Sequence, residues 1–233
     1  MSRIARGDSA LATLVQSAPH LVQLVGQMRP TWELPALTVL DPAFLRRERI
    51  RGLVWDVDGT LTGDRLTELA PEAEAPFRTL LSAPDLRHVI LSNAGESRFC
   101  ELGELFPTIP ILRAYRLGGA VLHRKLEGRT DSWTAEELVA RLKEGARVIR
   151  KPSLVLMEYA IGQLGCGRDA IVMVGDQYLT DVAGANLGGV RSVKLPTIAP
   201  ESFRRSVRLS QRLEALAYRV FHRSRRPESP PVR

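Results

Sequence analysis

The sequence predicts an α/β fold in which helices cover both faces of a parallel sheet. Two observations support this fold class: short apolar runs at residues 53–55, 89–91 and 171–174 alternate with helical segments, and two of these runs end in an acidic turn. Uninterrupted apolar runs are typical of strands that are buried on both faces. Alternation with helices favours a parallel sheet, because each parallel connection needs a crossover.

The expected elements follow the chain in order. Residues 1–30 predict two short amphipathic helices that break at Pro19, and residues 50–55 predict the first strand. Residues 71–81 predict a helix, because a proline suits its first turn and two glutamates lie near the positive end of its dipole. The later elements are expected as a strand at 89–91, a helix at 96–105, a hairpin at 113–124, helices at 134–143 and 152–164, a strand at 170–174, a helix at 179–187 and a strand at 190–195.

Residues 113–147 are expected to form a small insertion, a lid. The stretch between Ser92 and Lys151 is longer than one helix and one strand require. Gly118-Gly119 predicts a hairpin within it, and Asp131 or Ser132 is the expected cap of its helix. The chain then divides into a helical N-terminal extension (1–49), a core (50–200) with this insertion, an amphipathic basic helix (201–222) and a disordered tail (223–233).

The composition is that of a globular protein that buries a core. The chain has 233 residues, of which 44% are hydrophobic and 25% charged, and two cysteines cannot staple a protein of this size. Polar residues interrupt the apolar stretch at 10–25, so no membrane span is expected. We therefore expect a reducing, cytoplasmic location.

The positive charge is concentrated at the C-terminal end. From Glu201 onward nine arginines stand against three glutamates, so this part supplies +6 of the net charge of +7. In residues 201–222, apolar and basic side chains fall near opposite helical faces, as in a helix that lies on an anionic membrane surface. This hypothesis places the protein peripherally on the inner face of the membrane. The alternative is a terminal helix packed on the sheet with a solvated arginine face.

Acidic residues follow two of the expected strands. Asp56 and Asp58 follow the first strand, and Asp176 follows the run at 171–174, with Asp181 five residues further on. In an open α/β sheet, ligands bind beyond the carboxyl ends of the strands. Clustered carboxylates repel one another, and Mg²⁺ offsets that cost in sites that also hold phosphate oxygens. The alternative for the first segment is a turn that satisfies only its own backbone.

Two further polar motifs lie between these acidic turns. Ser92 and Asn93 close the strand at 89–91, and Lys151 precedes a predicted helix. A serine hydroxyl can donate to a phosphate oxygen, and a lysine supplies a positive point charge. Each motif alone is typical of a cap or of solvated surface, but together with the acidic turns they indicate a phosphate site.

The four motifs resemble those of the haloacid dehalogenase (HAD) superfamily over about residues 50–195. The matching residues are Asp56-x-Asp58-Gly59-Thr60, Ser92-Asn93, Lys151-Pro152 and Gly175-Asp176-x4-Asp181. The resemblance implies a Rossmann-like three-layer fold and a Mg²⁺-dependent hydrolase that phosphorylates its own aspartate. The second acidic residue of the first motif implies a phosphatase, because it suits protonation of an alcohol leaving group.

The resemblance also implies a role for each matching position. Asp56 is the implied nucleophile and Asp58 the implied general acid and base, while Ser92 and Lys151 would hold the transferring phosphoryl group. The remaining implied roles are substrate contacts by Gly59, Thr60 and Asn93, and Mg²⁺ ligation by Asp56, Asp58 (through its backbone carbonyl), Asp176 and Asp181.

A narrower resemblance is to the bacterial YqeG group and its yeast counterpart, which are HAD phosphatases associated with phosphatidylglycerophosphate. It rests on a proline near residue 30, Leu45, the basic run before residue 50, Arg150-Lys151-Pro152, and Gly175-Asp176-Gln177 with Asp181. The chain departs from that group at Asp58-Gly59, where the group usually has Asp-Asn, and in the extra residues 113–147.

Other functions stay open at this point. The main alternative is a phosphatase of a small soluble phosphomonoester, such as a sugar, nucleotide or short acid phosphate. A non-catalytic HAD-like binding module is less favoured, because every expected motif residue is present. A polynucleotide 3′-phosphatase is a minor alternative, in which the basic tail would follow a nucleic-acid backbone. The sequence does not predict an oligomeric state.

Overall fold

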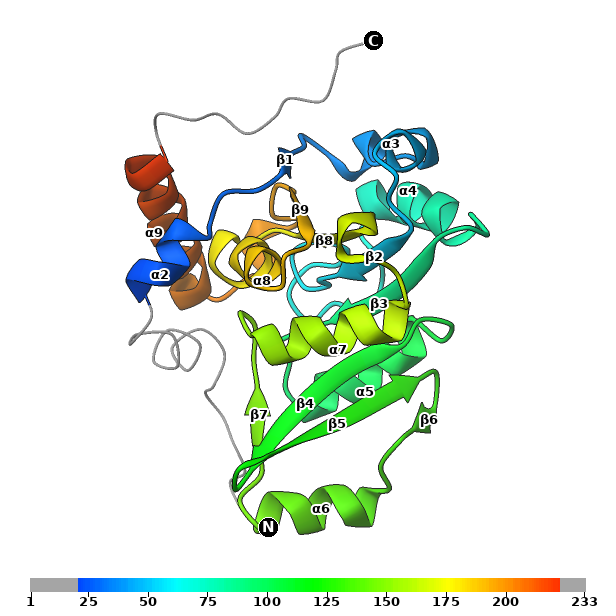
Figure 1. Ribbon diagram of the computed structural model, residues 1–233. Coiled ribbons are helices and arrows are strands. Elements are labelled where there is room, and N and C mark those ends of the chain that lie inside the picture. Colours follow the sequence, from blue (N-terminus) through cyan, green and yellow to red (C-terminus); the bar gives the residue numbers. More distant parts are fainter. Residues whose placement is uncertain (1–20, 223–233) are drawn as a thin grey trace.

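A mostly parallel sheet organises the computed structural model, which describes residues 21–222, with side chains from residue 24 on (Figure 1). The strands are β1 (Trp32–Glu33), β2 (Gly52–Trp55), β3 (Arg87–Leu91), β4 (Ile111–Leu117), β5 (Ala120–Glu127), β6 (Thr130–Asp131), β7 (Arg147–Ile149), β8 (Ile171–Gly175) and β9 (Arg191–Lys194). Their order is β1-β9-β8-β2-β3-β4-β5-β6, and β7 pairs with β4. The expected α/β fold with a parallel central sheet is confirmed.

The sheet changes direction at β4. Neighbouring strands from β1 to β4 in this order are parallel, whereas β5, β6 and β7 are antiparallel to their partners. β4 pairs with β3 at Ile111 and Leu112 and with β7 at residues 114–116, so β7 continues the line of β3. The central pair β2 and β8 is in parallel register, with Trp55 opposite Val174.

Helices cover both faces of this sheet. The helices are α2 (Leu21–Gly26), α3 (Pro42–Arg47), α4 (Pro71–Leu81), α5 (Glu96–Leu105), α6 (Ala135–Lys143), α7 (Leu154–Leu164), α8 (Ala183–Leu187) and α9 (Arg205–His222), with shorter turns η2 (Leu37–Val39), η3 (Arg168–Ala170), η4 (Tyr178–Val182) and η5 (Pro200–Ser202). Figure 1 shows α7 on one side of the sheet and α5 on the other. The predicted helices between residues 71 and 187 are therefore present.

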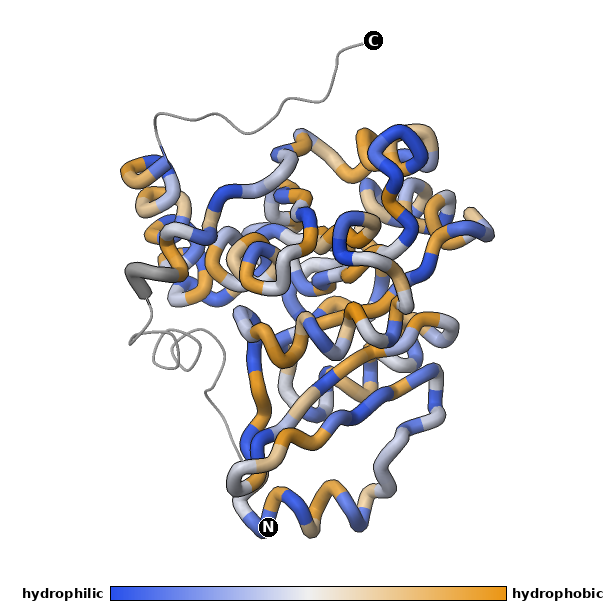
Figure 2. Tube along the Cα trace, viewed as in Figure 1, coloured by the Kyte–Doolittle hydropathy of each residue, from blue (hydrophilic) through white to orange (hydrophobic). Residues whose placement is uncertain are grey.

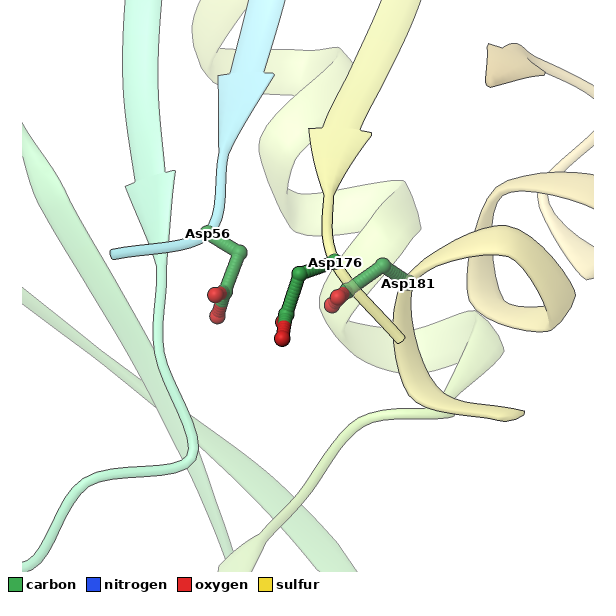
Figure 3. A group of neighbouring side chains, drawn as sticks. All are labelled: Asp56, Asp176 and Asp181. Carbon is green, nitrogen blue, oxygen red and sulfur yellow. The ribbon is translucent and has the colours of Figure 1, made fainter. Parts of the chain in front are cut away.

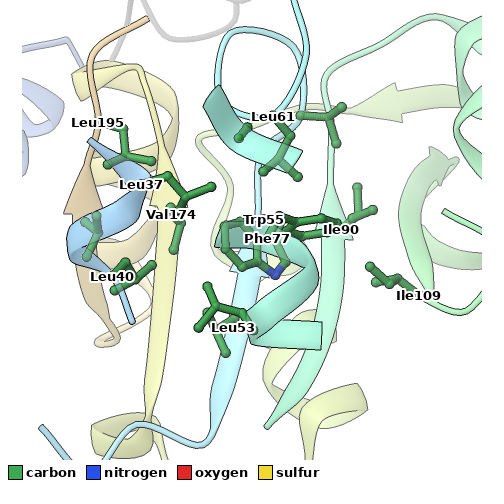
Figure 4. Close-up of a cluster of buried hydrophobic side chains, with 14 of the residues drawn as sticks. Leu37, Leu40, Leu53, Trp55, Leu61, Phe77, Ile90, Ile109, Val174 and Leu195 are labelled. Carbon is green, nitrogen blue, oxygen red and sulfur yellow. The ribbon is translucent and has the colours of Figure 1, made fainter. Parts of the chain in front are cut away.

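Alternate side chains of the central strands supply two separate apolar cores. Leu53 and Trp55 of β2 lie in one core with Ile90 of β3, and Val54 lies in the other core on the opposite face. Figure 4 shows the first core, where the Trp55 and Phe77 rings meet edge to face at 5.1 Å. Because burying one such side chain stabilises the fold by about 1.5–3 kcal/mol, β2 is held firmly from both faces.

Two local features differ from the sequence expectation or extend it. The N-terminal extension contributes a strand as well as helices, because β1 pairs with β9. The expected cap of α6 at Asp131 or Ser132 is wrong: Thr134 caps this helix, and its side chain and that of Glu137 bond reciprocally to each other's backbone N–H groups. The predicted helical segment before residue 21 and the predicted tail at 223–233 lie outside the described residues.

Residues 113–147 extend the sheet and also carry α6. Arg113 and Arg124 of the β4–β5 hairpin are buried and donate to the two carboxylate oxygens of Glu96, each at 2.7 Å. Arg113 also donates to the carbonyl of Ala94 at 2.6 Å. These hydrogen bonds hold the hairpin against the loop after β3. That residues 113–147 act as a lid remains a prediction.

The C-terminal helix α9 lies at one edge of the molecule beside α2 (Figure 1). Leu209, Leu213, Leu216 and Val220 on this helix are more than half exposed, whereas Tyr218 is buried. Among the helices of residues 21–222, none combines the length and the apolar character that a membrane crossing requires. The basic helix predicted at 201–222 thus forms, with its apolar row toward solvent.

We predict that His88 makes the fold sensitive to acid. The Trp55 indole donates to His88 Nδ1 at 3.1 Å, and burial lowers the pKa of His88 to about 4, although a Leu80 backbone contact opposes this. In the unfolded chain, His88 takes up a proton near pH 6.5, whereas in the folded protein it does so only near pH 4. The free energy of unfolding should therefore fall by about 2 kcal/mol as the pH drops from 6.5 to 4.

Urea unfolding at pH 7 and pH 4.5 measures this loss. His88→Asn keeps an acceptor for the indole but cannot titrate, so its free energy of unfolding should fall less than that of the wild type. Equal falls in the two proteins would contradict the prediction.

Candidate active site

Three carboxylates converge beyond the ends of β2 and β8. Asp56 follows β2, Asp176 follows β8, and Asp181 lies in η4, the turn that comes next in the chain. Figure 3 shows the three side chains pointing toward a common space, and a ligand oxygen from each lies within 4.8 Å of the others. The parallel register of β2 and β8 produces this meeting, because both strands end at the same edge of the sheet.

Glycines allow the backbone to approach this cluster closely. Gly175 ends β8, and a Cβ atom there would collide with the side chain of Asp181. Gly59 has a positive φ of 96°, and a Cβ atom at this position would lie 2.7 Å from Asp176 Oδ2. Both positions therefore require glycine for the carboxylates to meet.

Lys151 supplies the positive charge within the cluster. Its Nζ donates to Asp56 Oδ1 at 2.6 Å and to Asp181 Oδ1 at 2.7 Å, and the side chain is buried. Burial alone would lower the pKa of Lys151, but the charges of Asp181 and Asp56 outweigh it and raise the pKa above its ordinary value. The lysine is therefore held as an ammonium ion between two carboxylates.

The negative charge of the three carboxylates still exceeds the positive charge around them. Burial raises the pKa of Asp56 well above its ordinary value, against the opposing charge of Lys151, and the charges of Asp181 and Asp176 add to the rise. Burial and the charge of Asp181 raise the pKa of Asp176 to about 7. With the longer-range charges of Lys194 and Glu214 included, two ammonium groups face four carboxyl groups, an excess of negative charge that a further cation would balance.

The donor set of this cluster fits a divalent cation. Asp176 Oδ1 is buried and has no hydrogen-bond partner within the described residues. Its other oxygen accepts from Thr197 Oγ1 at 2.7 Å and from Gln211 Nε2 at 3.1 Å, which fixes the carboxylate. Carboxylate oxygens are the ligands that hard divalent cations prefer, so Asp56, Asp176 and Asp181 can hold such an ion.

Of the other residues singled out in the sequence, Thr60 contacts the cluster, Asn93 contacts the backbone of Lys151 and Ser92 makes a local contact. Thr60 is buried and its hydroxyl donates to Asp56 Oδ2 at 3.1 Å, so it orients the carboxylate. Asn93 accepts from the backbone N–H of Lys151 at 2.7 Å and donates to the Lys151 carbonyl at 3.0 Å. Ser92 Oγ accepts from the N–H of Ala94 at 3.1 Å. Both hydrogen-bonding groups of the Asn93 side-chain amide are thus used to fix the backbone of Lys151.

Asp58 is not one of the three clustered carboxylates, and its side chain has partners of its own. Its Oδ1 accepts from Arg98 Nη2 at 2.9 Å, from Thr62 Oγ1 at 3.4 Å and from the backbone N–H of Arg65 at 3.3 Å. Arg98 is buried on α5 and also donates to the carbonyl of Leu66 at 2.7 Å. Asp58 therefore stands beside the cluster, held by an arginine.

Comparison with known proteins supports one superfamily. Residues 148–197, which are 50 of the 233, match a family model described as HAD-hydrolase-like. This match supports membership of the HAD superfamily. The matched stretch contains Lys151, Asp176 and Asp181, three of the residues that meet in the cluster.

Comparison with curated proteins and with solved structures gives a weak structural likeness. No curated protein matches this chain. One solved structure, an uncharacterised protein from Listeria monocytogenes serotype 4b, is 17% identical and has a TM-score of 0.37, with 65% of this chain and 88% of that chain covered.

Three residues of the site lie outside the four motifs that resemble those of the HAD superfamily. Thr197 follows β9 at the same edge of the sheet, so its place at a strand end could have indicated it. Arg98 lies within α5, and Gln211 lies within α9. Neither has a local pattern that indicates its partner, because each contact joins elements far apart in the chain.

We predict that the carboxylate cluster of Asp56, Asp176 and Asp181 binds Mg²⁺ and that this binding stabilises the fold. At one hundred times its dissociation constant, a ligand adds about 2.7 kcal/mol, which should raise the Tm by about 5–10 °C. Asp176→Asn should abolish the shift because it removes a ligand charge from the cluster. Thermal unfolding with and without Mg²⁺ measures it.

Asp58→Asn is the matched control for this measurement. It removes the same charge from a side chain that contacts Arg98 rather than the cluster, so it should keep the Mg²⁺-induced shift even if its starting Tm is lower. A shift that survives in Asp176→Asn would contradict the assignment of the ligands.

Proposed function

We propose that this protein is a Mg²⁺-dependent phosphatase that hydrolyses phosphomonoesters through an aspartyl-phosphate at Asp56. The observation that carries the proposal is the buried cluster in which Lys151 bridges Asp56 and Asp181 beside Asp176. Such a site offers a nucleophilic carboxylate, a fixed positive charge and ligands for a cation in one water-poor space. The HAD-like match over residues 148–197 supports hydrolase chemistry of this type.

In the first step, an oxygen of Asp56 attacks the phosphorus atom of the substrate. A bond forms between this oxygen and phosphorus, while the bond between phosphorus and the alcohol oxygen breaks. Thr60 keeps the attacking carboxylate in place through its hydrogen bond to Oδ2. Positioning of this kind supplies a large part of the rate in phosphoryl transfer.

Asp58 is the proposed acid and base. Every hydrogen bond that its side chain makes to the described residues uses Oδ1, so Oδ2 is the oxygen that can carry a proton. In its acid form Asp58 gives this proton to the leaving alcohol oxygen. In the second step it takes a proton from water, whose oxygen attacks phosphorus and releases phosphate and Asp56.

Charge on the phosphoryl oxygens is balanced by cationic and polar groups of the site. Lys151 lies next to Asp56 and would contact an oxygen of the phosphoryl group bound there. Ser92 accepts a backbone hydrogen bond with its oxygen, so its hydroxyl proton can be donated to a phosphoryl oxygen. A Mg²⁺ ion held by Asp56, Asp176, Asp181 and the Asp58 carbonyl would supply Lewis-acid stabilisation of the same oxygens.

Two substrate classes are compatible with this chemistry. A lipid phosphate such as phosphatidylglycerophosphate is favoured by the exposed apolar side chains of α9, a helix that also donates Gln211 to Asp176. A small soluble phosphomonoester is the second candidate, which the shared chemistry of the cluster equally allows. A non-catalytic binding module has less support, because the cluster retains both a nucleophile and a counter-charge.

We predict that Asp56→Asn abolishes both turnover and the phosphoenzyme, because an amide is a poor nucleophile. Asp58→Asn should lower kcat by about a hundred- to ten-thousandfold, since it removes general acid and base catalysis. A panel of lipid, sugar, nucleotide and short acid phosphates, assayed with Mg²⁺, measures turnover and identifies the substrate class.

Acid-quench trapping of the phosphorylated protein separates the two roles. The Asp58→Asn protein should still become phosphorylated on Asp56, but slowly. Turnover that persists in Asp56→Asn would rule out the covalent route.

A further inference from the structure

The face of α9 that packs on the protein carries polar side chains together with Tyr218 and Ala215, which join a small apolar cluster. Gln211 Nε2 donates to Asp176 Oδ2 at 3.1 Å, and the carboxylate of Glu214 accepts from the backbone N–H of Leu179 at 3.3 Å. The Tyr218 ring stacks on Tyr178 at 4.1 Å. These side chains recur every three or four residues, so they form one stripe of the helix that faces the site.

The opposite face of α9 is apolar and exposed. Leu209, Leu213, Leu216 and Val220 also recur every three or four residues, and they are 57%, 56%, 57% and 63% exposed. Figure 2 shows apolar residues recurring along this helix at the edge of the molecule. A helix on a globular protein ordinarily buries its apolar stripe, so this reversed arrangement leaves the stripe available to a partner.

Arginines line one side of this apolar stripe. Arg205, Arg208 and Arg212, with Leu209, surround an open hollow of about 290 Å³. Arg219 continues the same flank one turn before the end of the helix and is exposed. The chain beyond α9, at 223–233, adds four more arginines against one glutamate. The charge around the stripe therefore complements an anionic surface.

We propose that α9 docks on an anionic membrane surface, with its apolar stripe among the lipid chains and its arginines at the headgroups. An interfacial helix combines a strong apolar stripe with basic residues beside it, and it lies in the plane of the membrane without crossing it. The inward face meanwhile keeps its contacts with Asp176 and with Leu179. Docking thus needs no rearrangement of the helix.

Docking through α9 would hold the carboxylate cluster one helix diameter, roughly 10 Å, from the lipid headgroups. Gln211 joins the helix directly to Asp176, so the cluster lies on the other side of the docked helix from the membrane. The substrate would then be a phosphate carried by a membrane lipid, an extension that rests on the proposed phosphatase activity. Docking itself stands on the surface of α9 alone.

Sedimentation with vesicles tests the docking. Full-length protein at low salt should sediment with vesicles of phosphatidylcholine that contain about one third phosphatidylglycerol, and far less with phosphatidylcholine alone. The double variant Leu209→Ser with Leu213→Ser should bind at least about tenfold more weakly, because it removes apolar burial in the membrane. Arg212→Ala should weaken binding about fivefold.

The matched control is Val139→Ser with Leu142→Ser. These two apolar residues of α6 are 49% and 40% exposed, and the change should leave vesicle binding as in the wild type. Wild-type protein that ignores anionic vesicles, or an α9 double variant that binds as the wild type does, would overturn the proposal. Loss of self-association in the α9 variant, with no vesicle binding by the wild type, would assign the stripe to a second copy of this chain instead.

Hydrolysis of a soluble aryl phosphate keeps this test separate from the proposed function. The α9 double variant should retain that hydrolysis, because the changed leucines do not contact the cluster. Vesicle binding without any hydrolysis would refute the phosphatase and leave the docking intact. Hydrolysis without vesicle binding would refute the docking and leave the proposed phosphatase activity intact.

Discussion

The ammonium group of Lys151, lying 2.6 Å from Asp56 and 2.7 Å from Asp181, is the interaction on which the site depends. All three side chains are buried at the end of the sheet, where an uncompensated charge costs several kcal/mol. Lys151 and the more distant Lys194 stand against three clustered carboxyl groups and Glu214, so the charge around Asp176 stays negative. That imbalance is the physical basis for the predicted binding of a divalent cation.

The fold brings this lysine to the carboxylates from a distant part of the chain. Lys151 lies between β7 and α7, and both hydrogen bonds of the Asn93 amide hold its backbone. The loop that carries Asn93 is in turn fastened to the β4–β5 hairpin, because Arg113 donates to Ala94 and to Glu96. The β4–β5 hairpin therefore supports the site by fixing the loop that carries Asn93.

The helix α9 links the site to the molecular surface. Its Gln211 completes the hydrogen bonds of Asp176, while its leucines point in the opposite direction. The inward face of this helix buries Tyr218 and part of Ala215, but none of these leucines. The exposed stripe thus has a cost in stability that a function at an interface would explain.

The sequence by itself determined the strands that end at Asp56 and Asp176, because apolar runs followed by acidic turns are local patterns. It also indicated Lys151, through the order of the motifs. Only the tertiary structure decided that Asp58 meets Arg98, forty residues away, and which face of α9 packs inward. An amphipathic pattern shows that a helix has two faces, but the partners that hold one of them come from distant elements, and these meet only when the chain is folded.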